Sequence, residues 1–190
     1  HGIKRLMKKY KIFVACDSSN ISKVKEIIKK TQNNKLKVGY KFGLQFLNSK
    51  NGRNFLSKLK NHVTFGDYKF SDIPNTCAEA VKSVKDLNFN YLTIHISAGI
   101  NALKKAKKVC GNTKLVGVTI LTSLDNKSLR EIGYSKSLKE LVIHQAKLAK
   151  MANLDGIVCS AQEVKLVKKV FYKEIITPGI RFNTGNNDQK

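Results

Sequence analysis

The sequence predicts an α/β protein built from parallel strands, and three observations predict it. Short apolar runs rich in β-branched residues alternate with longer amphipathic stretches along the chain. Polar residues follow nearly every apolar run. The chain has 190 residues, of which 42% are hydrophobic and 26% charged, as expected of one globular domain with a sizeable core. We therefore expect a single domain over residues 1–190.

Seven strands and six intervening helices are expected. The strands cover Ile12–Cys16, Lys35–Tyr40, Val63–Lys69, Tyr91–Ile96, Lys114–Leu121, Gly156–Ser160 and Glu174–Pro178. The helices cover about Ile21–Lys30, Phe55–Asn61, Thr76–Asp86, Ala98–Val109, Leu138–Met151 and Glu163–Phe171. Thr76 and Glu79 fit a capping box at the start of the third helix. Strict alternation of this kind predicts right-handed βαβ units.

Polar residues at the strand ends favour a closed barrel over an open sheet. An open doubly wound sheet concentrates its site at one switch point, whereas a barrel carries polar groups at the carboxyl ends of many strands. Such groups are Asp17, Lys69, His95, Thr122, Ser160 and Arg181. We therefore predict a TIM (β/α)8 barrel with the eighth β/α unit missing from this chain. The domain is then C-terminally incomplete, and the natural protein is expected to continue past Lys190.

The formal net charge of +23 suggests a polyanion partner or a compositional bias. Only four of the 36 basic residues are arginine, and the lysines are scattered over the predicted helix faces. This pattern favours the bias, so we expect no specific nucleic-acid binding. No apolar run approaches the roughly 18 residues of a membrane span, and no signal peptide is visible, which predicts a cytoplasmic protein. The four cysteines lack metal-ligand spacing, so we expect reduced thiols and no metal site.

A set of charged residues on the second and third strands is the chemical centre of the sequence. Asp67 and Lys69 are two residues apart on a strand, so both side chains should project from one face. Asp72 follows in the next loop, and Lys37 lies in the neighbouring strand. Two lysines and two aspartates sum to zero charge, which makes their burial together feasible. For an Asp-x-Lys pair alone, a structural salt bridge is an equally good interpretation.

The longer string around these charges resembles the signature of orotidine 5′-phosphate decarboxylases. It consists of Asp67-x-Lys69 followed by Asp72-Ile73-Pro74-Asn75-Thr76. Further segments resemble the family in the right order: Val14–Asp17, Leu36–Gly39, Val118–Ser123, Val158–Glu163, Thr177–Arg181, then Gly185 and Asp188-Gln189. The resemblance covers roughly residues 12 to 190.

The resemblance implies a carboxy-lyase that converts orotidine monophosphate to uridine monophosphate, in pyrimidine synthesis, without metal or cofactor. Lys69 would be the general acid that protonates C6, and Asp67 would face the substrate carboxylate. Lys37 and Asp72 would complete the catalytic array. The substrate-binding residues would be Asp17, Lys37, Asp72, Thr76, Thr122, Arg181 and Gln189. The enzymes of the family are homodimers with shared active sites, so Asp72 and Thr76 would serve the partner's substrate.

The sequence departs from the family most clearly in its phosphate-binding residues, and it leaves three competing hypotheses. The Gly-Arg pair that follows strand eight in the family, and completes phosphate binding, is not in this sequence. A magnesium-dependent sugar-phosphate decarboxylase or synthase of the same superfamily also carries Asp-x-Lys-x-x-Asp, and a chelator test would separate it from the decarboxylase. The net charge taken alone would fit a non-enzymatic basic polyanion-binding protein. The missing eighth strand would fit a truncated, inactive barrel.

Overall fold

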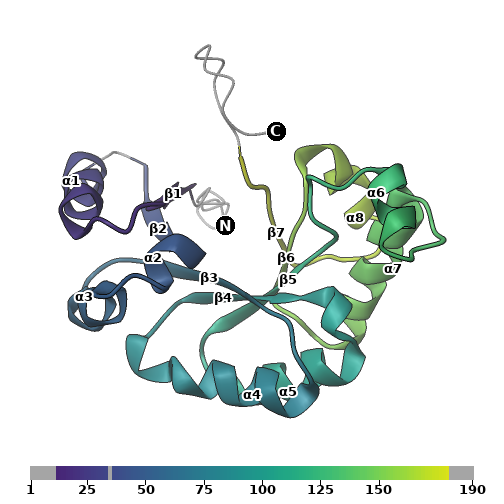
Figure 1. Ribbon diagram of the computed structural model, residues 1–190, viewed down its shortest axis with the longest axis horizontal. Coiled ribbons are helices and arrows are strands. Elements are labelled where there is room, and N and C mark those ends of the chain that lie inside the picture. Colours follow the sequence, from purple (N-terminus) through teal and green to yellow (C-terminus); the bar gives the residue numbers. More distant parts are fainter. Residues whose placement is uncertain (1–11, 34–35, 180–190) are drawn as a thin grey trace, which may run out of the picture. The chain divides into compact units, whose positions relative to one another are not determined.

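The structure, a computed structural model, describes residues 12–33 and 36–179, and its elements follow the predicted alternation (Figure 1). The strands are β1 (Ile12–Ala15), β2 (Val38–Phe42), β3 (Thr64–Phe70), β4 (Tyr91–His95), β5 (Lys114–Val118), β6 (Gly156–Val158) and β7 (Glu174–Ile176). The α-helices are α1 (Ile21–Thr31), α2 (Leu44–Leu47), α3 (Gly52–Lys58), α4 (Pro74–Ser83), α5 (Ile100–Val109), α6 (Asn126–Glu131), α7 (Leu138–Met151) and α8 (Val164–Val167). Short 3-10 helices cover Lys85–Leu87, Ile96–Ala98 and Ala161–Glu163.

The seven strands form one sheet whose order follows the chain from β1 to β7. Residue-by-residue pairing is parallel for β1 with β2, β2 with β3, β5 with β6 and β6 with β7. Parallel neighbours in chain order require crossover connections, which the helices supply. The predicted α/β protein with seven parallel strands is therefore confirmed.

Several predicted bounds are wrong. Strand β2 begins at Val38 and ends at Phe42, so it lies further along the chain than the expected Lys35–Tyr40. The expected helix near Phe55–Asn61 is α3, which begins earlier at Gly52, and α2 and α6 were not predicted. Helix α7, by contrast, has the predicted bounds and begins with a capping box between Ser137 and Glu140. None of the described helices is long and apolar enough to span a membrane.

The chain divides into two compact units, which we describe separately. The first contains the residues up to Tyr68 together with Val84–Tyr91. Its core includes three packed rings: Phe13 meets Phe65 and Tyr91 edge-on at 5.0 and 5.2 Å between centroids, and Phe65 stacks on Tyr91 at 5.7 Å. Aromatic pairs of this geometry stabilise a core beyond the area that they bury.

The second unit contains Lys69–Ser83 and the residues from Leu92 onward. Helices α4 and α5 lie side by side (Figure 1) and bury small and branched side chains such as Val81, Leu103 and Ala106. In β5, Gly117 leaves no room for a side chain, because an added Cβ would lie 2.7 Å from Ile96 Cγ1. The strand therefore packs directly against its neighbours at that position.

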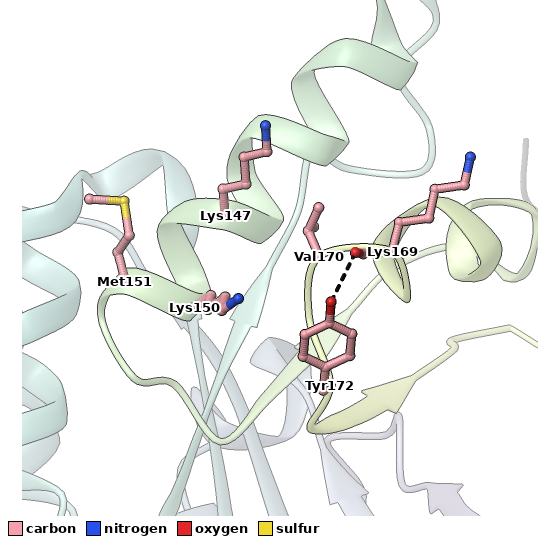
Figure 2. A pocket seen from close by; sticks show the side chains of 6 residues that line it. All are labelled: Lys147, Lys150, Met151, Lys169, Val170 and Tyr172. Atoms are coloured by element: carbon pink, nitrogen blue, oxygen red, sulfur yellow. Dashed lines mark hydrogen bonds between the residues drawn. The ribbon is translucent and has the colours of Figure 1, made fainter.

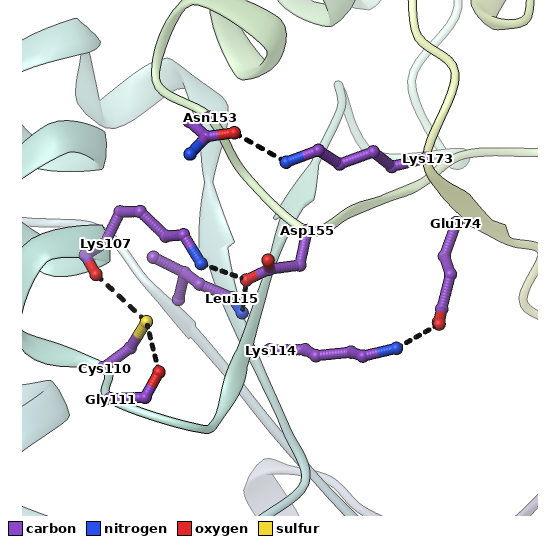
Figure 3. A network of polar contacts seen from close by, with 9 residues as sticks. All are labelled: Lys107, Cys110, Gly111, Lys114, Leu115, Asn153, Asp155, Lys173 and Glu174. Atoms are coloured by element: carbon purple, nitrogen blue, oxygen red, sulfur yellow. Dashed lines mark hydrogen bonds and ion pairs between the residues drawn. The ribbon is translucent and has the colours of Figure 1, made fainter.

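A polar network connects the amino-terminal ends of β5, β6 and β7 (Figure 3). Asp155 donates its backbone N–H to the Leu115 carbonyl at 2.9 Å, and its Oδ2 accepts from the Leu115 N–H at 2.9 Å. The same oxygen accepts from Lys107 Nζ at 2.6 Å. Beside this pair, Lys114 forms an ion pair with Glu174. The Asp155 side chain thus adds a hydrogen bond between β5 and β6, one residue before the first paired residues of the two strands.

Candidate active site

In the first unit, three charged residues gather around the carboxyl end of β2. The register pairs Ala15 with Lys41, which places Lys41 beside the last residue of β1. Lys41 Nζ lies 3.6 Å from Asp67 Oδ2, and the two side chains are 26% and 12% exposed. Asp17 is exposed just after β1, and its Oδ1 would lie 3.3 Å from a Cβ added at Gly43. Lys41 therefore lies on the strand between β3, which carries Asp67, and β1, which Asp17 follows.

Lys41, which the sequence patterns did not single out, reaches Asp67, and the catalytic and ribose-binding roles expected of Lys37 stay predictions. Lys37 precedes β2 and is exposed, so the expectation that it lies inside the second strand is wrong. The reason is visible in the sequence: Lys37-Val38-Gly39 and Lys41-Phe42-Gly43 are both Lys-x-Gly tripeptides, four residues apart. Four is an even number, so both lysines share one face of an extended strand. The two lysines differ only in which of them lies near the carboxyl end of the strand.

Cys16 is buried. Its thiol pKa is raised to about 12, chiefly by burial and also by the Asp17 carboxylate, while Lys41 opposes the shift. A thiol with this pKa is protonated at neutral pH and is a poor nucleophile. The chemistry of this region therefore belongs to the lysine and the carboxylates.

In the second unit, Lys69 has an unusual backbone. Its φ is 49°, in the left-handed region, although it lies within β3. A non-glycine residue in this region costs about 1–3 kcal/mol and persists only where its surroundings hold it. Its backbone N–H donates to Thr93 Oγ1 at 2.9 Å, and Thr93 is fully buried in β4. Strain of this kind is typical of functional positions.

Asp72 and Thr76 are exposed at the start of α4. The helix begins at Pro74, so the capping box expected at Thr76 is wrong, because Thr76 already lies in the first turn. Asp72 Oδ1 instead accepts from the Ile73 N–H at 2.7 Å, and the Asp72 carbonyl accepts from Cys77 Sγ at 3.2 Å. Proline suits the first helical position, since its missing N–H has no helical partner there.

Thr122 is exposed in the turn that follows β5. The segment before it is fixed by a buried amide that the sequence patterns did not single out: Gln145 Oε1 of α7 accepts from the Ile120 N–H at 2.8 Å. The predicted phosphate ligands Arg181 and Gln189 lie outside the described residues. Among the described residues, no group of three or more histidine, cysteine, aspartate or glutamate side chains could hold a metal ion.

A separate pocket of about 570 Å³ lies elsewhere, between the end of α7 and the segment before β7 (Figure 2). It is lined by Lys147, Lys150, Met151, Lys169, Val170 and Tyr172. None of the predicted site residues lines it. It lies at the amino-terminal ends of β6 and β7, whereas active sites of parallel βα folds lie at the carboxyl ends. We therefore place the candidate site at the strand-end charges and not in this pocket.

A parallel sheet with lysine and aspartate side chains near the carboxyl ends of its strands is the framework of an α/β enzyme. A profile of the orotidine 5′-phosphate decarboxylase / HUMPS family matches residues 10–190, and the chain belongs to this family. Orotidine 5′-phosphate decarboxylase from Wolbachia sp. subsp. Brugia malayi is 45% identical over 160 residues, which cover 81% of this chain and 71% of the relative.

Two solved structures are also similar. The crystal structure of orotidine 5′-phosphate decarboxylase from Lactobacillus acidophilus has a TM-score of 0.80 and 33% identity, covering 90% of this chain and 81% of that one. Orotidine 5′-monophosphate decarboxylase from Methanocaldococcus jannaschii, complexed with the inhibitor BMP, has a TM-score of 0.74 at 21% identity, covering 92% and 79%. The latter supports the fold alone.

These relatives confirm the predicted resemblance. The family and its named members indicate an orotidine 5′-phosphate decarboxylase, which is a carboxy-lyase. Neither the magnesium-dependent sugar-phosphate enzymes nor a polyanion-binding protein is favoured by the relatives.

Proposed function

We propose that this chain decarboxylates orotidine 5′-phosphate to uridine 5′-phosphate without a metal or a cofactor. The observation that carries the proposal is the ion pair between Lys41 and the buried Asp67, followed two residues later in the same strand by the backbone-strained Lys69. Charges that are fixed in advance are what a reaction through a carbanion requires, because they need no rearrangement as charge develops.

Each charged residue has a distinct task in the proposed reaction. The bond between C6 and the carboxylate breaks, its electron pair stays on C6, and carbon dioxide leaves. The Lys69 ammonium stabilises that electron pair and then donates a proton to C6. Asp67 faces the substrate carboxylate, and this like-charge contact is relieved when carbon dioxide departs. Lys41, with its Nζ 3.6 Å from Asp67 Oδ2, holds that carboxylate in place, and Lys37 and Asp72 complete the array, as the resemblance implies.

The remaining predicted residues bind the substrate in this proposal. Asp17 and Lys37 contact the ribose, and Thr122 approaches the pyrimidine. Arg181 and Gln189 bind the phosphate, and binding energy at that remote group can support strain at the reacting carbon.

We further propose a homodimer in which Asp72 and Thr76 complete the partner's site. Both are exposed, and Ile73 between them is 66% exposed, as expected of a segment that a second copy covers. We also infer that the seven strands belong to a (β/α)8 barrel forming one domain. The four cysteines are free and buried, which supports a reducing compartment such as the cytoplasm.

Three lysine variants of the full-length protein test the proposal through the loss of orotidine monophosphate absorbance. Lys69→Ala should abolish turnover, and Lys41→Ala should lower kcat by about 100-fold or more, the loss typical of one electrostatic group. Lys25→Ala is the matched control and should stay near wild type, because Lys25 is an exposed lysine of α1 outside the predicted site.

Full activity of Lys69→Ala would refute the proposed acid. A loss in Lys25→Ala as large as that in Lys41→Ala would refute the role of Lys41. Turnover should also persist in excess EDTA, and its loss would favour the magnesium-dependent enzymes of the superfamily.

A further inference from the structure

Lys69 is exceptional among the described residues with a left-handed backbone. Four non-glycine residues have a positive φ: Asn61, Lys69, Asn88 and Asn153. The three asparagines lie in bends or turns, and asparagine tolerates this conformation better than most residue types. Lys69 is the one lysine among the four, and it lies within a strand. Its own residue type and its place in a strand both oppose its conformation, so neighbouring groups must hold it.

Thr93 supplies a contact that can hold this conformation. Its Oγ1 accepts the backbone N–H of Lys69 at 2.9 Å. Thr93 is 0% exposed, so water does not compete for this hydrogen bond. Its χ1 is restricted by its β-branched side chain, which fixes the hydroxyl relative to β4. A rigid acceptor therefore binds the backbone N–H of Lys69, whose nitrogen is one end of the bond about which φ is defined.

We propose that Thr93 is a positioning residue that aims Lys69 by holding its backbone in the left-handed conformation. The direction of the Cα–Cβ bond follows from the backbone torsions, so this hydrogen bond sets where the lysine side chain leaves the strand. The inference rests on the proposed function, in which Lys69 protonates C6. Thr93 does not touch the substrate in this account and acts only through Lys69.

The matched control is a second buried threonine in the same sheet. Thr119 follows β5, is 1% exposed and donates its hydroxyl to the Val158 carbonyl at 3.2 Å. Threonine to valine at either position removes one buried hydroxyl and keeps the branched shape. Only the change at Thr93 removes a contact to Lys69. The pair therefore separates the general cost of losing a buried hydroxyl from the positioning effect.

The experiment compares Thr93→Val, Thr93→Ser and Thr119→Val with wild type in the full-length protein. Thr93→Val should lower kcat about 10- to 100-fold, because small displacements of a reacting group carry penalties of this order. The KM for orotidine monophosphate should change by less than about threefold, since ground-state binding is kept. Thr93→Ser keeps the hydroxyl and should restore kcat to within about threefold of wild type. Exchange of the Lys69 amide hydrogen should accelerate in Thr93→Val alone.

Each result is decisive. The inference is overturned if Thr93→Val retains the wild-type kcat, if its KM rises as kcat falls, or if Thr119→Val loses as much activity. Failure of Thr93→Ser to restore kcat would also overturn it. A wild-type protein without turnover would instead overturn the proposed function, whereas an active wild type with an equally active Thr93→Val overturns the positioning role alone.

Discussion

Asp155 offers the sharpest test of what holds the second unit together. Its carboxylate accepts two hydrogen bonds, from Lys107 Nζ at 2.6 Å and from the Leu115 N–H at 2.9 Å. Leu115 is 0% exposed, so its N–H cannot turn to water when the acceptor is removed. Asp155→Ala removes both bonds, whereas Asp155→Asn removes the charge and keeps an oxygen that can accept from the Leu115 N–H.

The expected loss follows from these contacts. A buried donor left without a partner costs about 1–3 kcal/mol, and a hydrogen bond to a charged group contributes about 1.5–3 kcal/mol. The side chains of Lys107 and Asp155 are each 23% exposed, which moves the ion pair toward the lower value. We therefore expect Asp155→Ala to lower the free energy of unfolding by about 3 kcal/mol, or about 6–12 °C in Tm. Asp155→Asn should cost about 1 kcal/mol.

Urea unfolding followed by circular dichroism, with calorimetry for Tm, measures both variants. Glu131→Ala is the control, because the Lys127–Glu131 pair is 3.9 Å long with side chains 81% and 62% exposed. Such a pair contributes about 0.5 kcal/mol or less. Equal losses in Asp155→Ala and Glu131→Ala would refute the reasoning. Equal losses in Asp155→Ala and Asp155→Asn would show that the charge, and not the Leu115 hydrogen bond, dominates.

Three further predictions follow from single contacts. Gly117→Ala should lower the free energy of unfolding by about 1–3 kcal/mol, because the added Cβ would lie 2.8 Å from Leu154 Cδ1. Urea unfolding measures this loss, and an unchanged midpoint would contradict the prediction. Hydrogen bonds from Ser137 lower the pKa of Glu140 below its ordinary 4.5. A carboxyl group with a lowered pKa in the folded protein stabilises the fold at pH values above its pKa in the unfolded chain. Wild type should therefore be more stable than Glu140→Gln at pH 6, and this advantage should be lost as the pH falls below about 4. Urea unfolding midpoints measure the difference. Cys16, with its thiol pKa raised to about 12, should resist iodoacetamide at pH 8 until the protein unfolds, as mass spectrometry would show.

The strand and helix order could be predicted from the sequence because long periodic segments carry their own signal. Leu138–Met151 is predicted to the residue, since its apolar positions recur at helical spacing and Ser137 caps it. The helices that were misplaced or missed are short: α2 has four residues, α6 six and α3 seven. Fewer than two turns leave too few positions for a helical period to emerge.

The site was predicted less completely because the charges in it depend on register. Asp67, Lys69 and Asp72 were singled out from one contiguous string, and their roles stay predictions. Lys41 was missed because Lys37 has the same tripeptide pattern, and only the pairing of Lys41 with Ala15 reveals which lysine lies at the strand end. Thr93 is an ordinary strand residue in the sequence, and nothing local marks the left-handed backbone that it contacts.

The repeated Lys-x-Gly pattern of β2 also poses a problem for the folding chain itself. A slip of four residues keeps the alternation of faces intact, so alternation alone cannot reject the wrong register. Two contacts reject it. At Gly39 an added Cβ would lie 2.9 Å from the Phe13 ring, and at Tyr40 the hydroxyl meets Thr31 Oγ1 at 2.9 Å. In the slipped register a side chain would occupy the place of Gly39, and Leu36 would occupy the place of Tyr40. These contacts therefore favour the observed register of β2 beside β1 over the slipped one.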